Sequence, residues 1–96
     1  MQELFRQNRK MGKPPLRWLV RKNGQPFASF LFCPDKTHKT AVLRNRSKRI
    51  LRELVRKNLS LIPVGFDCAL LVQVGFAKLS KEDREVLFLS ALKQFP

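Results

Sequence analysis

The sequence predicts an α+β protein in which helices cover one face of a small β-sheet. Residues 36–57 have the spacing of an amphipathic helix, strand-like apolar segments lie on both sides of them, and a second apolar helix follows near the C-terminus. The 96 residues are enough for one domain with a modest core, so residues 1–96 are treated as a single domain. The expected order is helix, two or three strands, basic helix, strand and helix, which makes a small two-layer α/β sandwich.

The first third of the chain predicts a helix fragment followed by strands. Residues 1–10 are expected to be helical, with Phe5 among the apolar contacts, and residues 11–15 should interrupt the chain because they contain one glycine and two prolines. Residues 16–21 alternate between two faces, which is typical of a strand. Asn23-Gly24 then predicts a hairpin turn.

The remaining strands and the last helix follow from apolar runs and their boundaries. Residues 27–33 form the expected returning strand, which Pro34 should end. Residues 66–74 are almost continuously apolar, as in a strand inside a sheet. Ser80 is a candidate N-cap for the last helix. A helix separates residues 27–33 from residues 66–74, so we expect these two strands to be parallel. We also expect one face of the sheet to be covered by helices and the other to be partly open.

The basic helix in the middle of the chain combines two faces. Thr40 is its expected N-cap. An apolar stripe that can pack on a sheet consists of Leu43, Leu51, Ile50, Leu54 and Val55. The opposite side carries cations over about 18 Å of helix axis, a length that suits several nucleotide phosphates. Arginine dominates this side, which favours bidentate contact with phosphate.

The charge of the whole chain points to a polyanionic partner. Twenty Lys and Arg against seven Asp and Glu give a net charge of +13, which is costly unless an anion neutralises it. Nucleic acid is the first candidate partner and an anionic membrane surface the second. No apolar run approaches the ~20 residues that span a bilayer, and the first ten residues lack the apolar segment of a secretory signal, so a cytoplasmic location is expected.

Catalytic and metal-binding patterns are nearly absent from the sequence. The acids Glu82, Asp83 and Glu85 fall in a first helical turn, where the helix dipole favours them. The single histidine, His38, is expected in a loop, either solvated or touching a phosphate. Two cysteines are expected to be buried and reduced, although a disulfide between neighbouring strands stays open, and no spacing suggests zinc: Cys33 and Cys68.

One segment closely resembles a family signature. Residues 41–53, AVLRNRSKRILRE, are similar to the Ala-Val-x-Arg-Asn-Arg-x-Lys-Arg segment that opens a long helix in the bacterial ribonuclease P protein component. The order of the remaining elements fits the family more weakly. Two departures stand out: the chain begins in the middle of the family's first helix, which we therefore expect to be truncated, and residues 33–39 replace a stretch usually richer in Val, Ser, Lys and Gly.

The resemblance implies the protein subunit of a ribonucleoprotein endonuclease that removes the 5′ leader from precursor tRNA. In that family the catalytic RNA carries the active site and the catalytic Mg²⁺, and the protein holds the single-stranded leader in a cleft between sheet and helix. The protein would thus need no catalytic or metal-binding side chain of its own. The implied fold is ribosomal protein S5 domain 2-like, with a left-handed crossover around the basic helix, opposite to the general rule.

The resemblance, together with the cationic face, assigns the RNA-binding residues: Lys36, Arg44, Asn45, Arg46, Lys48, Arg49, Arg52 and Arg56. Phe5 and Trp18 are candidate walls of the leader cleft, on which bases could stack. Core packing is the alternative for both aromatics and is favoured for Trp18.

The sequence also allows three other functions. A non-enzymatic RNA-binding module, such as a ribosomal or RNA-assembly protein, would show no preference for precursor over mature tRNA. A DNA-binding protein would place the basic helix in a major groove. A peripheral membrane protein is the least favoured, because the apolar side of the basic helix is needed for the core.

Overall fold

The computed structural model describes residues 9–95 and contains four strands, three α-helices and one short 3-10 helix in that range. Along the chain they are β1 (Arg9–Lys13), β2 (Leu16–Lys22), β3 (Ser29–Pro34), α2 (Ala41–Lys57), η1 (Leu59–Leu61), β4 (Phe66–Val72), α3 (Val74–Ala77) and α4 (Lys81–Leu92).

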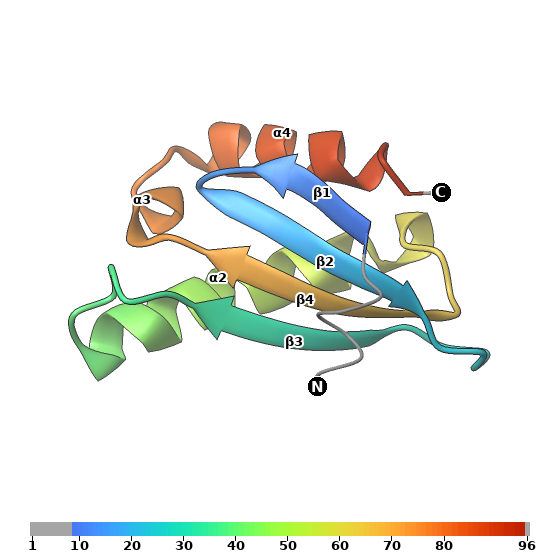
Figure 1. The fold of residues 1–96 in the computed structure, drawn as a ribbon. Coiled ribbons are helices and arrows are strands. Elements are labelled where there is room, and N and C mark those ends of the chain that lie inside the picture. Colours follow the sequence, from blue (N-terminus) through green and yellow to red (C-terminus); the bar gives the residue numbers. More distant parts are fainter. Residues whose placement is uncertain (1–8, 96) are drawn as a thin grey trace.

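The strands form one mixed sheet in the order β1-β2-β4-β3 (Figure 1). β2 pairs antiparallel with β1 and with β4, and β3 pairs parallel with β4. The register places Met11 opposite Trp18 and Trp18 opposite Leu70, so these side chains share one face of the sheet. The parallel arrangement predicted for the strands on either side of the basic helix is confirmed.

The connection from β3 through α2 to β4 has the uncommon hand. In Figure 1, β3 and β4 both point left, β4 lies above β3, and α2 runs behind the sheet. This path is a left-handed crossover, as the family resemblance implied, whereas most parallel crossovers are right-handed.

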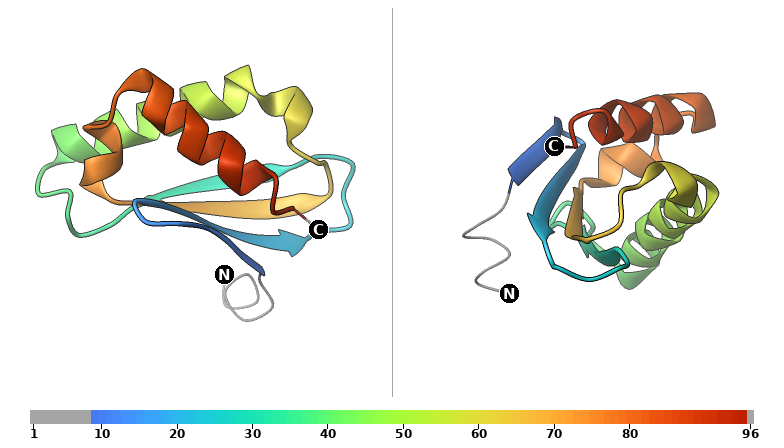
Figure 2. Two further views of the ribbon diagram at one scale, coloured as in Figure 1. Left: turned by 90° about the horizontal axis from the view of Figure 1, so that it is seen from above. Right: turned by 90° about the vertical axis from the view of Figure 1, so that its right-hand side faces the viewer.

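The helices make the second layer of a two-layer sandwich (Figure 2). α2 packs against β3 and α3, while α4 packs against β1 and β2, so both long helices cover the same face. Beneath α4, the Trp18 ring lies edge-on to Phe88 and Phe95, with ring centroids 5.2 and 5.9 Å apart. Leu51 and Leu54 bring α2 into the same core. The predicted fold class, with one face covered, is confirmed.

The predicted hairpin at Asn23-Gly24 is wrong. β2 and β3 are not neighbours, because β4 lies between them. Gly24 does adopt a turn conformation with φ of 68°, and the Asn23 side chain donates to the Phe27 carbonyl at 3.3 Å. The turn is therefore real, but it carries the chain past one strand position, which the continuously apolar β4 occupies.

Residues 9–13 are a strand rather than the end of a helix and a breaker. β1 forms the hairpin with β2, turning at a cis Pro14-Pro15 peptide bond. Gly12 has a φ of 77°, and a Cβ atom there would lie 2.8 Å from the Leu16 carbonyl oxygen. The glycine and prolines that predicted an interruption thus shape a tight hairpin. Most of the predicted first helix, including Phe5, lies outside the described residues.

The last helix follows the expectation, and the cysteines follow it in part. Ser80 caps α4 by accepting a hydrogen bond from the Asp83 amide at 3.1 Å. Cys33 and Cys68 are free thiols on adjacent strands, half-buried and buried respectively. Burial raises the pKa of Cys68 to about 12 and also raises that of Cys33. Across residues 9–95, no helix is both long and apolar enough to cross a membrane.

Replacing Trp18 should test its place in the core. Because the side chain is fully buried, Trp18→Ala should lower the free energy of unfolding by about 3–5 kcal/mol. Phe27 is 53% exposed, so Phe27→Ala should stay within about 0.5 kcal/mol of the parent protein. Urea unfolding followed by circular dichroism measures both. Equal losses would contradict the assignment.

The Asp67 carboxylate should make stability depend on acid pH. Hydrogen bonds from Asn23 at 3.0 Å and Arg21 at 3.2 Å, the Asn23 bond first, hold its pKa below the ordinary 3.8. The stabilisation is therefore present above about pH 3.8 and is lost as pH falls through the lower folded-state pKa. Asp67→Asn should remove this part of the acid destabilisation, as measured by urea unfolding between pH 7 and pH 3. An unchanged pH profile in the variant would rule the effect out.

Candidate nucleic-acid interface

The basic helix begins as the sequence predicts. The Thr40 hydroxyl accepts a hydrogen bond from the Leu43 amide at 3.2 Å, so Thr40 is the N-cap of α2. The first turn contains no acidic residue, and the last turn contains Arg56 and Lys57, where the helix dipole favours cations. Arg44 near the N-terminus works against the dipole, so its charge costs stability where it stands.

The buried side of α2 occupies mainly its second half. Leu51, Leu54 and Val55 are buried, and the half-buried Ile50 packs beside them. In the first half, Val42 is 75% exposed and Leu43 is half-buried. The predicted apolar stripe is therefore confirmed for its C-terminal part, while the N-terminal part extends beyond the core.

Most α2 cations lack an acidic partner within the described residues. The two ion pairs of the helix join Arg56 to Glu53 at 2.5 Å and Lys57 to Glu85 of α4 at 3.1 Å. Among residues 9–95, none of the ion pairs or side-chain hydrogen bonds involves the remaining cations of the helix: Arg44, Arg46, Lys48, Arg49 and Arg52. These charges can be neutralised by an external anion without breaking an internal contact.

The two flanks of α2 differ in charge. On the β3 side, the Arg52 guanidinium lies 5.9 Å from the centre of the Phe32 ring, and Lys48 is close enough to Cys33 to lower its pKa slightly against the larger effect of burial. A cation over an aromatic face keeps its positive charge available to solvent and ligand. The β3 flank is therefore the more uniformly cationic one.

The α4 flank borders a groove of about 330 Å³ between the two long helices. Ile50 and Leu54 give it an apolar floor, and Glu53 and Glu85 place negative charge on its rim beside cations. A phosphate on this side would approach two carboxylates. Four cations line the same groove, among them Arg49, so positive charge is present on both flanks and on the solvent face of α2.

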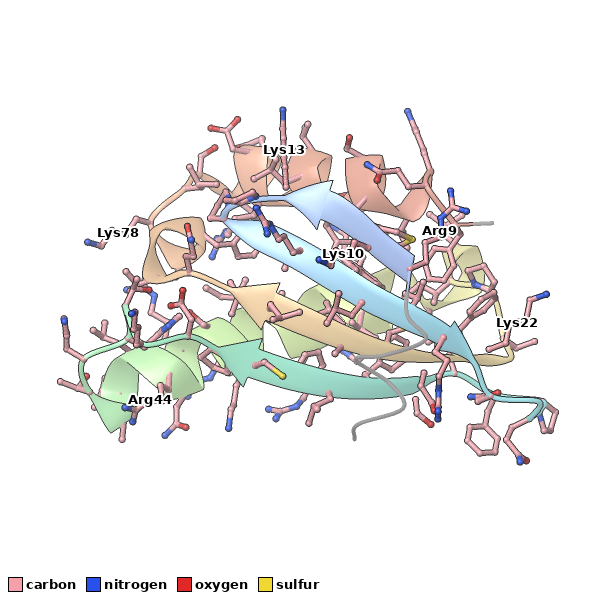
Figure 3. All side chains as sticks on the ribbon, in the orientation of Figure 1. Arg9, Lys10, Lys13, Lys22, Arg44 and Lys78 are labelled. Carbon is pink, nitrogen blue, oxygen red and sulfur yellow. The ribbon has the colours of Figure 1, made fainter. Side chains whose placement is uncertain are left out.

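The open face of the sheet carries a second set of cations. Lys10 projects from this face, while Lys22 and Arg44 mark opposite ends of the molecule (Figure 3). Leu19, Ala69 and Leu71 form a small apolar cluster on the same face. Basic groups around apolar side chains can hold a single-stranded nucleic acid through phosphates and bases together.

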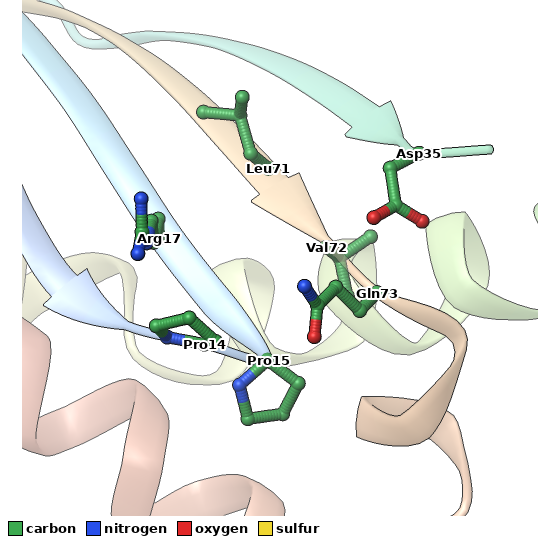
Figure 4. Close-up of a pocket in the computed structure, with 7 residues that line it drawn as sticks. All are labelled: Pro14, Pro15, Arg17, Asp35, Leu71, Val72 and Gln73. Atoms are coloured by element: carbon green, nitrogen blue, oxygen red, sulfur yellow. The ribbon is translucent and has the colours of Figure 1, made fainter. Parts of the chain in front are cut away.

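Two hollows meet on this face. One, of about 250 Å³, is bounded by Arg17, Leu71 and Gln73, with the two prolines of the β1–β2 turn on one side and Asp35 on the other (Figure 4). The other, of about 400 Å³, lies over β1 and β2 and reaches Leu71 of β4. Arg17 and Leu71 line both hollows. The alternation of Arg17, Leu19 and Arg21 was the sequence signal for this face; its β1 part was missed because residues 9–13 were expected to be non-strand.

The predicted RNA-binding residues all lie outside the core. Lys48 is half-buried, and the other seven are exposed: Lys36, Arg44, Asn45, Arg46, Arg49, Arg52 and Arg56. Lys36 stands in the loop before α2, and the rest follow the helix. The fold brings them together because they are consecutive in sequence, and their contact with RNA stays a prediction.

Core packing, the alternative favoured for Trp18, is confirmed over the leader-cleft role. The ring is 0% exposed and lies on the helix-covered face, so no base can stack on it in this structure. Trp18 shares this face with Leu16 and Val20, and the outward face of β2 belongs to Arg17, Leu19 and Arg21 instead. Phe5 lies outside the described residues, and its role stays a prediction.

His38 is also not the solvated loop residue that was expected. It is 1% exposed, and its ring lies between the Asp35 carbonyl and the Ser47 hydroxyl of α2. Polar sequence around a histidine predicts exposure, and only the fold reveals a buried partner nine residues away. Within the described part of the chain, no three His, Cys, Asp or Glu side chains gather in a way that could hold a metal ion.

Comparison with known proteins gives the same family by sequence. The family model for ribonuclease P matches residues 1–95. The ribonuclease P protein component of Thermotoga maritima is 32% identical over 85 residues, which cover 88% of this chain and 70% of the relative. That of Thermotoga sp. strain RQ2 is 37% identical over 70 residues, or 73% of this chain and 57% of the relative.

Solved structures agree in fold. The ribonuclease P protein from Thermotoga maritima superposes with a TM-score of 0.88 at 23% identity, covering 99% of this chain and 90% of that one. The Staphylococcus aureus ribonuclease P protein gives 0.82 at 18% identity, covering 96% and 84%. With the family model matching nearly the whole sequence, the chain belongs to the ribonuclease P protein family.

Proposed function

We propose that this subunit binds the catalytic RNA of ribonuclease P together with the 5′ leader of precursor tRNA, and so promotes 5′-end maturation of tRNA in the cytoplasm. The observation that carries the proposal is the row of exposed cations on α2 that have no acidic partner among the described residues. They stand in the family's signature segment, on a helix whose other face is fixed to the sheet.

The mechanism in this proposal is electrostatic and positional. Two RNAs repel each other, and cations between them reduce that repulsion and release counterions. Hydrolysis is assigned to the RNA subunit, with Mg²⁺ bound mainly by RNA. The protein would raise the effective affinity for Mg²⁺ by holding the leader and the catalytic RNA in place.

The leader is assigned to the open face of the sheet. Lys10 and Arg17 can meet phosphates there, and the apolar Leu19 and Leu71 can pack against bases. This assignment replaces the buried Trp18 with side chains that face outward. It also moves the leader from the expected cleft between sheet and helix to the face of the sheet that the helices leave open.

Reconstitution tests the proposal directly. The protein is added to a bacterial ribonuclease P RNA at a Mg²⁺ concentration where the RNA alone cleaves precursor tRNA slowly. Cleavage should increase because the protein reduces repulsion and holds the leader. Precursor tRNA should bind the assembled particle more tightly than mature tRNA or duplex DNA. No increase in cleavage, or equal affinity for all three, would refute the proposal in favour of a general nucleic-acid-binding module.

Single substitutions on α2 should weaken RNA binding without unfolding the domain. Arg46→Ala and Arg49→Ala each remove an exposed cation, so affinity for ribonuclease P RNA should fall about tenfold and the salt dependence should lose about one counterion. Lys93→Ala, which removes an exposed cation beyond α4, is the matched control and should bind normally. Filter binding over a salt series, with circular dichroism, measures this. If Arg46→Ala or Arg49→Ala unfolds the protein, that residue is structural.

A further inference from the structure

A polar network joins the end of β3 to the second turn of α2 and to the start of α3. It consists of Asp35, Thr37, His38 and Ser47, and we name it the β3–α2 latch. Its loop residues fall in residues 33–39, the stretch in which this chain departs from the family pattern.

The histidine makes the contact with α2. His38 Nδ1 lies 3.1 Å from the Asp35 carbonyl oxygen, and Nε2 lies 2.6 Å from Ser47 Oγ. Because a carbonyl can only accept, Nδ1 carries the proton in the neutral ring, and Nε2 accepts from the Ser47 hydroxyl. Both His38 and Ser47 are at most 1% exposed, so water does not compete for these bonds.

The other half of the latch fixes the loop to the sheet. The Asp35 carboxylate accepts from the Thr37 amide at 3.0 Å and from the Thr37 hydroxyl. The Thr37 hydroxyl oxygen in turn accepts from the Val74 amide at 2.8 Å, and the Asp35 amide donates to the Val72 carbonyl at 3.0 Å. The latch is therefore anchored to the ends of both parallel strands.

The first half of α2 buries few of its own side chains. Ser47 is the first buried residue of the helix, and the next is Leu51. Around the helix axis, Arg46 and Lys48 lie about 100° to either side of Ser47. The orientation of α2 that buries Ser47 therefore places these two cations on the sides of the helix. The core packs against the second half of α2, and the latch contacts the half that carries Arg44, Asn45 and Arg46.

We propose that the β3–α2 latch is a positioning device for RNA binding, which holds the first two turns of α2 in the orientation that presents the signature residues to RNA. The proposal rests on the proposed function. Without the latch, the first two turns of α2 would adopt the binding orientation for only part of the time. The apparent affinity for RNA would fall in proportion to that fraction.

The experiment compares Ser47→Ala, His38→Ala and His38→Gln with Ser90→Ala, a control that removes an exposed serine from α4. Amide hydrogen exchange in the free protein comes first. In Ser47→Ala and His38→Ala, exchange should accelerate for Asn45 to Lys48, while Leu54 and Val55 keep their protection because the core holds them. His38→Gln keeps a polar group near Nε2 and should recover part of the protection.

The second measurement is the affinity of each variant for ribonuclease P RNA over a salt series. Ser47→Ala and His38→Ala should bind about tenfold more weakly. Their salt dependence should stay that of the parent protein, because the bound state still makes the same phosphate contacts. His38→Gln should lie between, and Ser90→Ala should match the parent protein.

Failure of the proposed function and failure of the latch proposal can be told apart. If the parent protein does not bind the RNA, the proposed function fails and the latch proposal fails with it. If the parent binds and the variants bind equally well, the latch proposal alone is overturned. If the variants lose Leu54 and Val55 protection as well, the network supports the whole fold, and the positioning role is also overturned.

Discussion

β3 and β4 run parallel, so the chain between them must return along the whole sheet before β4 can begin. That return is α2. The pairing therefore decides that the basic helix lies across the sheet with its C-terminal half over the core. It also places the N-terminal turns of α2 at the end of the sheet where β3 and β4 finish (Figure 1). Strand direction therefore places the signature segment at this end of the sheet.

This arrangement assigns two conflicting requirements to different halves of α2. A helix that packs on a sheet needs apolar contacts, and a helix that binds a polyanion needs unpaired charge. α2 meets the first with Leu51, Leu54 and Val55 in its second half and the second with Arg44 and Arg46 in its first half. The first half contributes one buried side chain, Ser47, which the His38 ring contacts.

The sequence could predict elements whose periodicity is local and long. α2, its Thr40 cap, the apolar β4 and the Ser80 cap of α4 all follow from neighbours within a few residues, and the structure confirms them. The clustering of the cations of the candidate site could be predicted because they follow one another on one helix, and their contact with RNA stays a prediction.

The predictions that the structure overturns depended on contacts between segments that are distant in sequence. The place of β4 between β2 and β3 cannot be derived from the Asn23-Gly24 turn, since a turn specifies its own geometry and not the strand that fills the space beside it. β1 was missed because its glycine and its neighbouring prolines resemble an interruption until β2 is present to pair with them. Trp18 and His38 were ambiguous for the same reason, since an aromatic or a histidine is assigned to core or surface by its tertiary partners.

The C-terminal third of the chain explains how so small a protein tolerates its charge. Sixteen of the 20 cations precede residue 58, while α4 contributes Phe88 and Ala91 to the core and carries acids near its start. The edge-to-face contacts of Phe88 and Phe95 with Trp18 stabilise the sheet from the side opposite to the open face. Because this packing lies apart from the exposed cations, changes in surface charge and changes in the core should act independently on stability. The core of such a chain supplies the free energy that the mutual repulsion of the signature cations removes.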